Sequence, residues 1–251
     1  MAFRHLDPDF NTSRKASSNF ALALKSALVA LGFLWVILIF DISFRLDLFR
    51  FGLRPGSVLG LVGVITAPLL HANFQHLLSN TMPFVVSLTA MLFIYPNSSL
   101  RAIPAIWLGS GLLAWVIGRS TIHIGVSGVV YGMLAFVFIS GVLRRDMRSV
   151  SVSLLVAFLY GSMIWGVLPS QPYMSWEMHL SGAIMGASLG FLYRRWDLPP
   201  VKRYEWEDDD EIPDWFPREG DDREKEDDSG SRMIGDEGIE STPEKERRED
   251  R

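Results

Sequence analysis

The stretch FALALKSALVALGFLWVILIF, residues 20–40, carries a single charged residue, Lys25, among its 21 positions. A helix needs roughly 20 mostly apolar residues to cross the hydrocarbon core of a bilayer. The stretch therefore predicts a transmembrane helix, and it is too long for the apolar region of a cleavable signal peptide. This places the chain among membrane proteins.

Five further apolar stretches follow, at about 74–95, 100–118, 125–142, 150–168 and 178–194. The last three are shorter and rich in Gly and Ser, which is typical of helices that pack against other helices. The apolar runs between 41 and 73 are too short to span, so we expect short helices there, in or near the outer leaflet. The predicted fold is all-α: a polytopic membrane bundle of six transmembrane helices.

Charge separates the two ends of the chain. From Glu205 onward there are 21 Asp and Glu against 8 Lys and Arg, a net charge of −13, whereas the preceding residues carry a net charge of +9. Such a charged segment cannot bury a core and should be disordered in isolation. We expect an N-terminal cytoplasmic segment at 1–19, a membrane domain at 20–196 and an acidic cytoplasmic tail at 197–251. The tail either only solubilises the protein or docks a cytoplasmic partner.

The basic residues around the predicted spans indicate the topology, because Lys and Arg are enriched in cytoplasmic loops. With six spans, one side of the membrane receives most of them, and we assign that side to the cytoplasm. Both termini should then be cytoplasmic in a multi-pass protein of the cell membrane. The residues on that side are Arg4, Arg14, Lys15, Lys25, Arg101, Arg144, Arg145, Arg148, Arg194, Arg195, Lys202 and Arg203.

Polar residues of the types that take part in catalysis lie inside these apolar stretches, where burying them is costly unless they find partners. His76 and Asn80 begin the second span, Ser127 the fourth and His179 the sixth. These three spans cross the membrane in the same direction, so the fixed rise per residue of a helix places all the polar groups at a similar depth.

Glycines predict that two of these helices meet. Small residues at every fourth position allow close backbone approach in membranes, and His179 shares a helix face with the glycines that follow it. A close crossing of the fourth and sixth spans would bring His179 to Ser127. The glycines are Gly128 and Gly132 in the fourth span, and Gly182, Gly186 and Gly190 in the sixth.

This arrangement permits nucleophilic acyl transfer. The Ser127 hydroxyl needs a base within hydrogen-bond reach, and His179 is the candidate. The Ser127 amide at a helix N-terminus, with His76 and Asn80 one helical turn apart, could bind an oxyanion. No carboxylate is available at that depth, so the sequence predicts a dyad, with Tyr131 able to pack beside the imidazole.

The motifs HANFQHLLSN (71–80), GVSGVVYG (125–132) and HLSGAIMG (179–186) together resemble those of the rhomboid family of intramembrane serine proteases. Their order matches, as do the spacings of 51 residues from His76 to Ser127 and 52 from Ser127 to His179. The resemblance covers roughly residues 20–195. Two departures are Met178, where the family usually has alanine, and the lack of an evident Trp-Arg pair in the first loop.

The resemblance implies that Ser127 is the nucleophile and His179 the base. It implies that His76 and Asn80 bind the oxyanion with the Ser127 amide. Tyr131, stacked on His179, and the motif glycines Gly125 and Gly128 would support them. It also implies cleavage of transmembrane segments of other membrane proteins near the outer face, without metal or cofactor. The partners would be such substrates and the lipid bilayer, not nucleic acid, and the oligomeric state stays open.

Other interpretations remain at this point. His123, four residues before Ser127, is a rival base, and His71 is most simply an interfacial histidine. The chain could be a catalytically inactive rhomboid-like protein that binds membrane clients. It could also be a small transporter or scaffold, although Glu177 is almost the only charge near the spans that could line a path. A zinc protease is disfavoured because HExxH is absent, as are intramembrane aspartate pairs.

Overall fold

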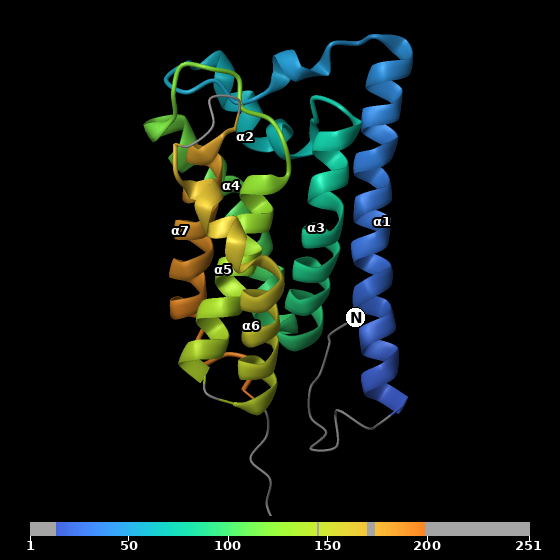
Figure 1. Ribbon diagram of the computed structural model, residues 1–251, viewed down its shortest axis with the longest axis vertical. Coiled ribbons are helices and arrows are strands. Elements are labelled where there is room, and N and C mark those ends of the chain that lie inside the picture. Colours follow the sequence, from blue (N-terminus) through green and yellow to red (C-terminus); the bar gives the residue numbers. More distant parts are fainter. Residues whose placement is uncertain (1–13, 145, 170–173, 199–251) are drawn as a thin grey trace, which may run out of the picture. The chain divides into compact units, whose positions relative to one another are not determined.

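The computed structural model describes residues 14–144, 146–169 and 174–198; the predicted acidic tail lies almost wholly outside them. Contacts divide the chain into Met1–Val201 and Lys202–Arg251, and all described residues belong to the first unit. Within these residues the fold is all-α, as predicted (Figure 1). The elements are α1 Arg14–Phe44, η1 Leu48–Phe51, η2 Leu59–Val62, α2 Gly63–Thr66, η3 Ala67–Leu69, α3 Phe74–Ile94, α4 Pro96–Ile117, α5 Ser127–Arg144, α6 Met147–Tyr160, η4 Gly161–Val167 and α7 Trp176–Leu192.

Five of the described helical segments are long and apolar enough to cross a membrane: α1, α3, α4, α5, and α6 taken together with η4. The last long helix, α7, has 17 residues, which corresponds to about 26 Å. That length is at the lower limit for a membrane-spanning helix. The predicted all-α membrane bundle is therefore confirmed, with five candidate spans among the described residues where six were predicted, because α7 is shorter than each of the five.

Helix boundaries differ from the predicted ones for local reasons. Helix α4 begins at Pro96 rather than near residue 100, because proline suits the first position of a helix, and Tyr95 caps both α3 and α4. Helix α5 begins at Ser127 and not at 125, because Gly125 has a φ of 113° that only glycine adopts readily. The serine therefore lies at the very start of its helix.

Helix α5 forms the centre of the bundle, since 67% of its 18-residue apolar stretch is buried. It packs against α7 so closely that glycine is required. A Cβ added to Gly182 would overlap the carbonyl oxygen of Gly128, and one added to Gly186 would overlap that of Gly132. Backbone oxygens cannot move aside as side chains can, so these two glycines fix the approach of α7 to α5.

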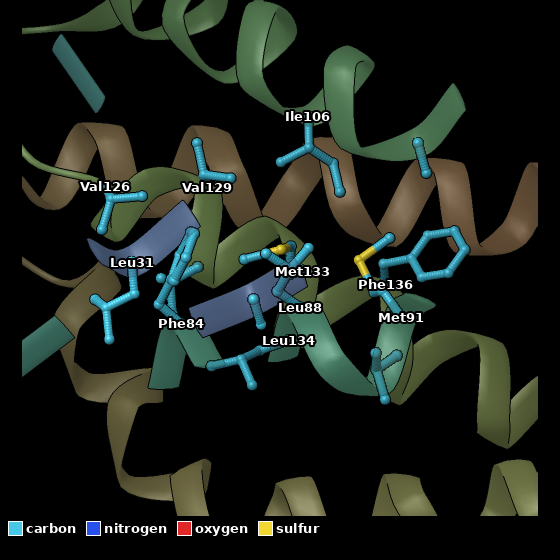
Figure 2. Close-up of a cluster of buried hydrophobic side chains, with 14 of the residues drawn as sticks. Leu31, Phe84, Leu88, Met91, Ile106, Val126, Val129, Met133, Leu134 and Phe136 are labelled. Atoms are coloured by element: carbon cyan, nitrogen blue, oxygen red, sulfur yellow. The ribbon is translucent and has the colours of Figure 1, made fainter. Parts of the chain in front are cut away.

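The hydrophobic core surrounds α5 on its other sides. Figure 2 shows side chains from α1, α3, α4 and α5 meeting there, and Figure 1 shows α3 between α1 and α5. Helix α1 packs mainly on α3 and leaves much of its own surface exposed. The labelled core residues are Leu31, Phe84, Leu88, Met91, Ile106, Val126, Val129, Met133, Leu134 and Phe136.

The segment between α1 and α3 forms the four short helices η1, η2, α2 and η3, as expected. Two tryptophans of α4 hold it: Trp115 Nε1 donates to the Ser57 carbonyl at 2.9 Å and Trp107 Nε1 to the Ile65 carbonyl at 3.1 Å. Leu53 forms an isolated antiparallel bridge with His123. These contacts fix the segment that leads into α3 beside the start of α5.

At the opposite end of the bundle, the residues after α7 dock onto the start of α4. The Asp197 carboxylate accepts hydrogen bonds from the backbone N–H groups of Asn97 and Ser98, both at 2.9 Å. It thus caps a helix 100 residues away, where the first N–H groups have no partner within their own helix. Arg144 of α5 donates to the Tyr193 carbonyl at 3.0 Å, which adds a second tie.

Candidate active site

Ser127 and His179 are within hydrogen-bond distance, with 2.8 Å between Ser127 Oγ and His179 Nε2. Ser127 is the first residue of α5, and His179 lies in the first turn of α7. Both side chains are largely buried, with 8% and 7% of their surface exposed. The convergence of a hydroxyl and an imidazole, predicted from helix direction and glycine spacing, is therefore present in the structure.

The other imidazole nitrogen fixes the protonation pattern of this histidine. His179 Nδ1 lies 2.9 Å from the carbonyl oxygen of Gly166 in η4. A carbonyl only accepts hydrogen bonds, so in the neutral ring Nδ1 carries the proton and donates it. Nε2 then presents its lone pair to the Ser127 hydroxyl, which is the arrangement that a general base requires.

Tyr131 stacks on the same imidazole. The two rings are nearly parallel, at 7°, with centroids 4.2 Å apart. The Tyr131 hydroxyl donates to the carbonyl of Met163 at 2.7 Å. The side chain therefore limits tilting of the His179 ring and also contacts η4, the element that carries Gly166.

His76 and Asn80 lie on α3 and line the same cavity as Ser127 and His179, a cavity of about 780 Å³. A Cβ built on Gly125 would lie 2.8 Å from His76 Nε2 and 3.8 Å from Ser127 Oγ, so both side chains border Gly125. His76 Nδ1 accepts from the Ala72 N–H at 3.5 Å, which leaves Nε2 as the donor in the neutral ring. Asn80 Nδ2 donates to the His76 carbonyl at 2.9 Å.

The motif glycines shape the backbone around the serine. The Gly125 N–H donates to the Ala67 carbonyl at 2.8 Å, which ties the loop before α5 to η3. Gly128 faces Met178, since an added Cβ would lie 3.0 Å from the Met178 carbonyl oxygen. Met178 itself is buried, and its side chain fits beside Gly128, so the bulkier residue at this position does not separate the two helices.

His71 lies at the entry to α3, as predicted, but it also has a structural partner. Its side chain is buried, and Nε2 accepts a hydrogen bond from the Val126 N–H at 3.3 Å, immediately before Ser127. Burial, together with the nearby His76, lowers the pKa of His71 from 6.5 to about 4. The ring is therefore neutral near pH 7 and able to accept this bond. Its spacing from His76 within one motif was the signal that could have revealed it.

His123 does not face Ser127. It is completely buried, its backbone pairs with Leu53, and its Nε2 lies 3.1 Å from the Arg119 carbonyl oxygen. It is not among the residues lining the cavity that contains Ser127. The rival assignment of His123 as the base is therefore wrong, and the residue braces the loop between α4 and α5.

Glu177, the second residue of α7, is fully buried. Its carboxylate pairs with the Arg119 guanidinium, and Arg119 Nη2 also donates to the Met174 carbonyl at 2.8 Å. These bonds anchor the first turn of α7, two residues before His179, to the end of α4. Sequence reasoning missed this ion pair because 58 residues separate its members. In the part of the chain that the structure describes, no group of His, Cys, Asp or Glu is arranged to hold a metal.

Comparison with known proteins places the chain in a family. A family model described as "Rhomboid domain" matches residues 59–196. The chain is 40% identical over 150 residues to uncharacterized proteins of Mycobacterium bovis and Mycobacterium tuberculosis, covering 56% of this chain and 62% of theirs. It is 32% identical over 174 residues to an uncharacterized protein of Mycobacterium leprae, covering 66% of this chain and 69% of the relative.

The helices define a multi-pass membrane protein. The protein belongs to the rhomboid family. The chain spans less than two thirds of the length of the first two relatives.

Proposed function

We propose that the protein is an intramembrane serine endopeptidase that cleaves transmembrane segments of membrane proteins. The observation that carries the proposal is the 2.8 Å contact between Ser127 Oγ and His179 Nε2. The contact lies in a cavity of about 780 Å³ that His76 and Asn80 also line. A nucleophile, a base in the correct tautomer and nearby hydrogen-bond donors are the parts that acyl transfer needs.

In the first step, Ser127 Oγ attacks the carbonyl carbon of the scissile peptide bond while its proton passes to His179 Nε2. The carbonyl π electrons move onto oxygen and form an oxyanion. When the C=O bond re-forms, the C–N bond breaks and the Nε2 proton passes to the leaving amine. The products of this step are a free amine and an ester of Ser127.

In the second step, water attacks the ester and gives a proton to His179 Nε2. The resulting tetrahedral oxyanion collapses, the ester C–O bond breaks, and the Nε2 proton returns to Ser127 Oγ. A carboxylic acid is released and the dyad is restored. Neither step consumes an oxidant, a reductant or a cofactor.

The oxyanion would be bound by donors from two helices. The Ser127 N–H lies at the first position of α5, where a helix has no internal partner for it and the dipole is positive. His76 Nε2, on α3, borders Gly125 in the cavity that Ser127 also lines, and Asn80 provides a second amide hydrogen. Preformed donors of this kind act where negative charge develops in the transition state.

The charge pattern supports the proposed orientation, with both termini in the cytoplasm and the cavity near the outer face. The apolar surfaces of α1 and α6 fit contact with the lipid bilayer. A substrate segment would have to expose a peptide bond in the cavity, so an unwound end of a transmembrane helix is the expected substrate.

Labelling with a serine-reactive fluorophosphonate probe tests the proposal. We expect the purified full chain to be labelled, and both Ser127→Ala and His179→Ala to lose the label. Ser140→Ala is the matched control, because Ser140 is a buried serine of the same helix that does not line the cavity. Equal labelling of Ser127→Ala and the unmodified protein would reject the nucleophile, and the absence of labelling in every sample would favour a rhomboid-like protein that binds clients without cutting them.

A further inference from the structure

The short helix η4 meets the candidate active site at two backbone carbonyls. The Gly166 carbonyl accepts from His179 Nδ1 at 2.9 Å, and the Met163 carbonyl accepts from the Tyr131 hydroxyl at 2.7 Å. Both donors belong to the pair of stacked rings beside Ser127. The base of the dyad is thus oriented by an element that contains neither member of the dyad.

Apart from these bonds, η4 and the preceding α6 pack loosely. None of the described residues of η4 is buried, and only Ser149, Ser153 and Val156 are buried in α6. In the segment that the two helices form, only 11% of the most apolar 18-residue stretch is buried. Segments with few buried contacts open at low free energy. The carbonyl that orients His179 is therefore carried by the least anchored of the long apolar segments.

Residue 166 must be small where it lies. A Cβ built there would overlap the Tyr131 hydroxyl oxygen and would lie 3.4 Å from His179 Nδ1. The Tyr131 ring cannot readily give way, because it is stacked on the imidazole and bonded to Met163. Gly166 therefore both offers its carbonyl and makes room for the hydroxyl that holds η4.

We propose that Gly166 is a positioning residue whose carbonyl sets the tautomer of His179, so that docking of η4 makes the dyad competent. The inference rests on the proposed protease function. When η4 is docked, Nδ1–H donates to Gly166 and Nε2 is free to accept the serine proton. When η4 moves away, nothing at Nδ1 favours this tautomer, and a ring protonated on Nε2 cannot act as a base.

Three variants and one control test the steric part of the proposal in a cleavage assay on the full chain. Gly166→Ala should lower kcat by about 10- to 100-fold, since small displacements of a catalytic group have effects of this size. Tyr131→Phe should lower kcat less, because it removes only the bond to Met163. The double variant should recover part of the loss, because the atom nearest the new Cβ becomes Tyr131 Cζ, at 3.1 Å.

Gly161→Ala is the matched control. It makes the same change in the same short helix, at a position where an added Cβ meets nothing within 4 Å. Its kcat should equal that of the unmodified chain. Equal losses in Gly161→Ala and Gly166→Ala, or no recovery in the double variant, would overturn the proposal.

Nitrogen-15 NMR of histidine-labelled protein measures the tautomer directly and does not depend on proteolysis. The chain has five histidines, and the spectrum of His179→Asn assigns the signals of His179 by difference. We expect protonation at Nδ1 in the unmodified protein and an increased Nε2–H population in Gly166→Ala. An Nε2–H tautomer in the unmodified protein, or an unchanged spectrum in the variant, would overturn the assignment. A correct tautomer without any cleavage or probe labelling would reject the protease function alone.

Discussion

Helix α5 and the segment formed by α6 and η4 follow one another in the chain and are similarly apolar, yet their surroundings differ. In α5, 67% of the 18-residue apolar stretch is buried, against 11% of the corresponding stretch in the segment formed by α6 and η4. Both segments contain small residues, so the prediction that Gly and Ser mark 150–168 as packed against other helices is wrong. The segments differ in what their glycines meet: Gly128 and Gly132 of α5 lie against the backbone of α7, whereas Gly161 of η4 has nothing within 4 Å. Apolar character alone thus indicates that a helix is in the membrane, whereas glycines that lie against a neighbouring backbone mark the helix that is surrounded by protein.

The difference has a consequence for the proposed chemistry. Ser127 and His179 lie on the two helices whose separation is fixed by backbone contact, whereas Gly166 lies on the loosely packed segment. The distance between nucleophile and base should therefore be insensitive to movement of α6 and η4. The tautomer of the base should be sensitive to it.

Replacing a glycine by leucine at the contact between α5 and α7, and again in the segment of α6 and η4, should give the largest difference in activity and stability. Gly182→Leu places a side chain against the Gly128 carbonyl, so α7 must move away from α5. We expect proteolytic activity to be lost and the free energy of unfolding to fall by about 3 kcal/mol, the upper end for overpacking. Gly161→Leu enters open space and should leave both quantities nearly unchanged. Denaturation in detergent and the cleavage assay measure these effects, and similar losses in both variants would contradict the contrast.

Helix α3 is intermediate in burial, with 39% of its 18-residue apolar stretch buried. It carries the proposed oxyanion donors His76 and Asn80. His76→Ala or Asn80→Ala should each lower kcat by about 10²- to 10³-fold, the usual cost of one such donor. The fold should persist, which circular dichroism can verify. Gln75→Ala changes an exposed residue of the same helix outside the cavity and serves as the control. Unchanged kinetics in both alanine variants would remove α3 from the chemistry.

Acid should weaken the attachment at the start of α5. The pKa of His71 is about 4 in the folded protein against an ordinary 6.5, mainly through burial. As pH falls from 6.5, the unfolded chain therefore gains the proton first, and stability declines toward pH 4 by up to about 3 kcal/mol. His71→Gln retains an acceptor for the Val126 N–H but does not titrate. Its stability should fall less over the same pH range, and an identical decline would exclude His71 as the cause.

Two phenylalanines provide the smallest contrast. Phe136 of α5 is fully buried, whereas Phe158 of α6 is 86% exposed. Lipid is as apolar as a protein core, so Phe136→Ala should cost mainly the cavity term, about 2 kcal/mol for a void of about 100 Å³. Phe158→Ala should change stability by less than about 0.5 kcal/mol. Thermal unfolding of the two variants measures the difference, and equal shifts would mean that α6 is as well packed as α5.

Sequence periodicity and composition predicted the features that repeat along the chain. The apolar stretches gave the helices, and shared direction with glycine spacing brought Ser127 and His179 together. Features that depend on a single long-range contact were not predictable. Nothing marks Gly166 as the partner of His179 Nδ1, and the Arg119–Glu177 pair joins residues 58 positions apart. The bond that His71 accepts from the Val126 N–H was not predictable either, because it depends on how the loop before α5 folds.

The cap that Asp197 provides to α4 bears on where the membrane domain can be shortened. The rhomboid family match ends at residue 196, one position before this aspartate. A protein truncated after 196 would lose the acceptor for the Asn97 and Ser98 amides, a loss that typically costs about 0.5–2 kcal/mol. A protein truncated after 204 retains it while discarding the acidic segment. The functional boundary of the domain therefore lies beyond the boundary by which its family is recognised.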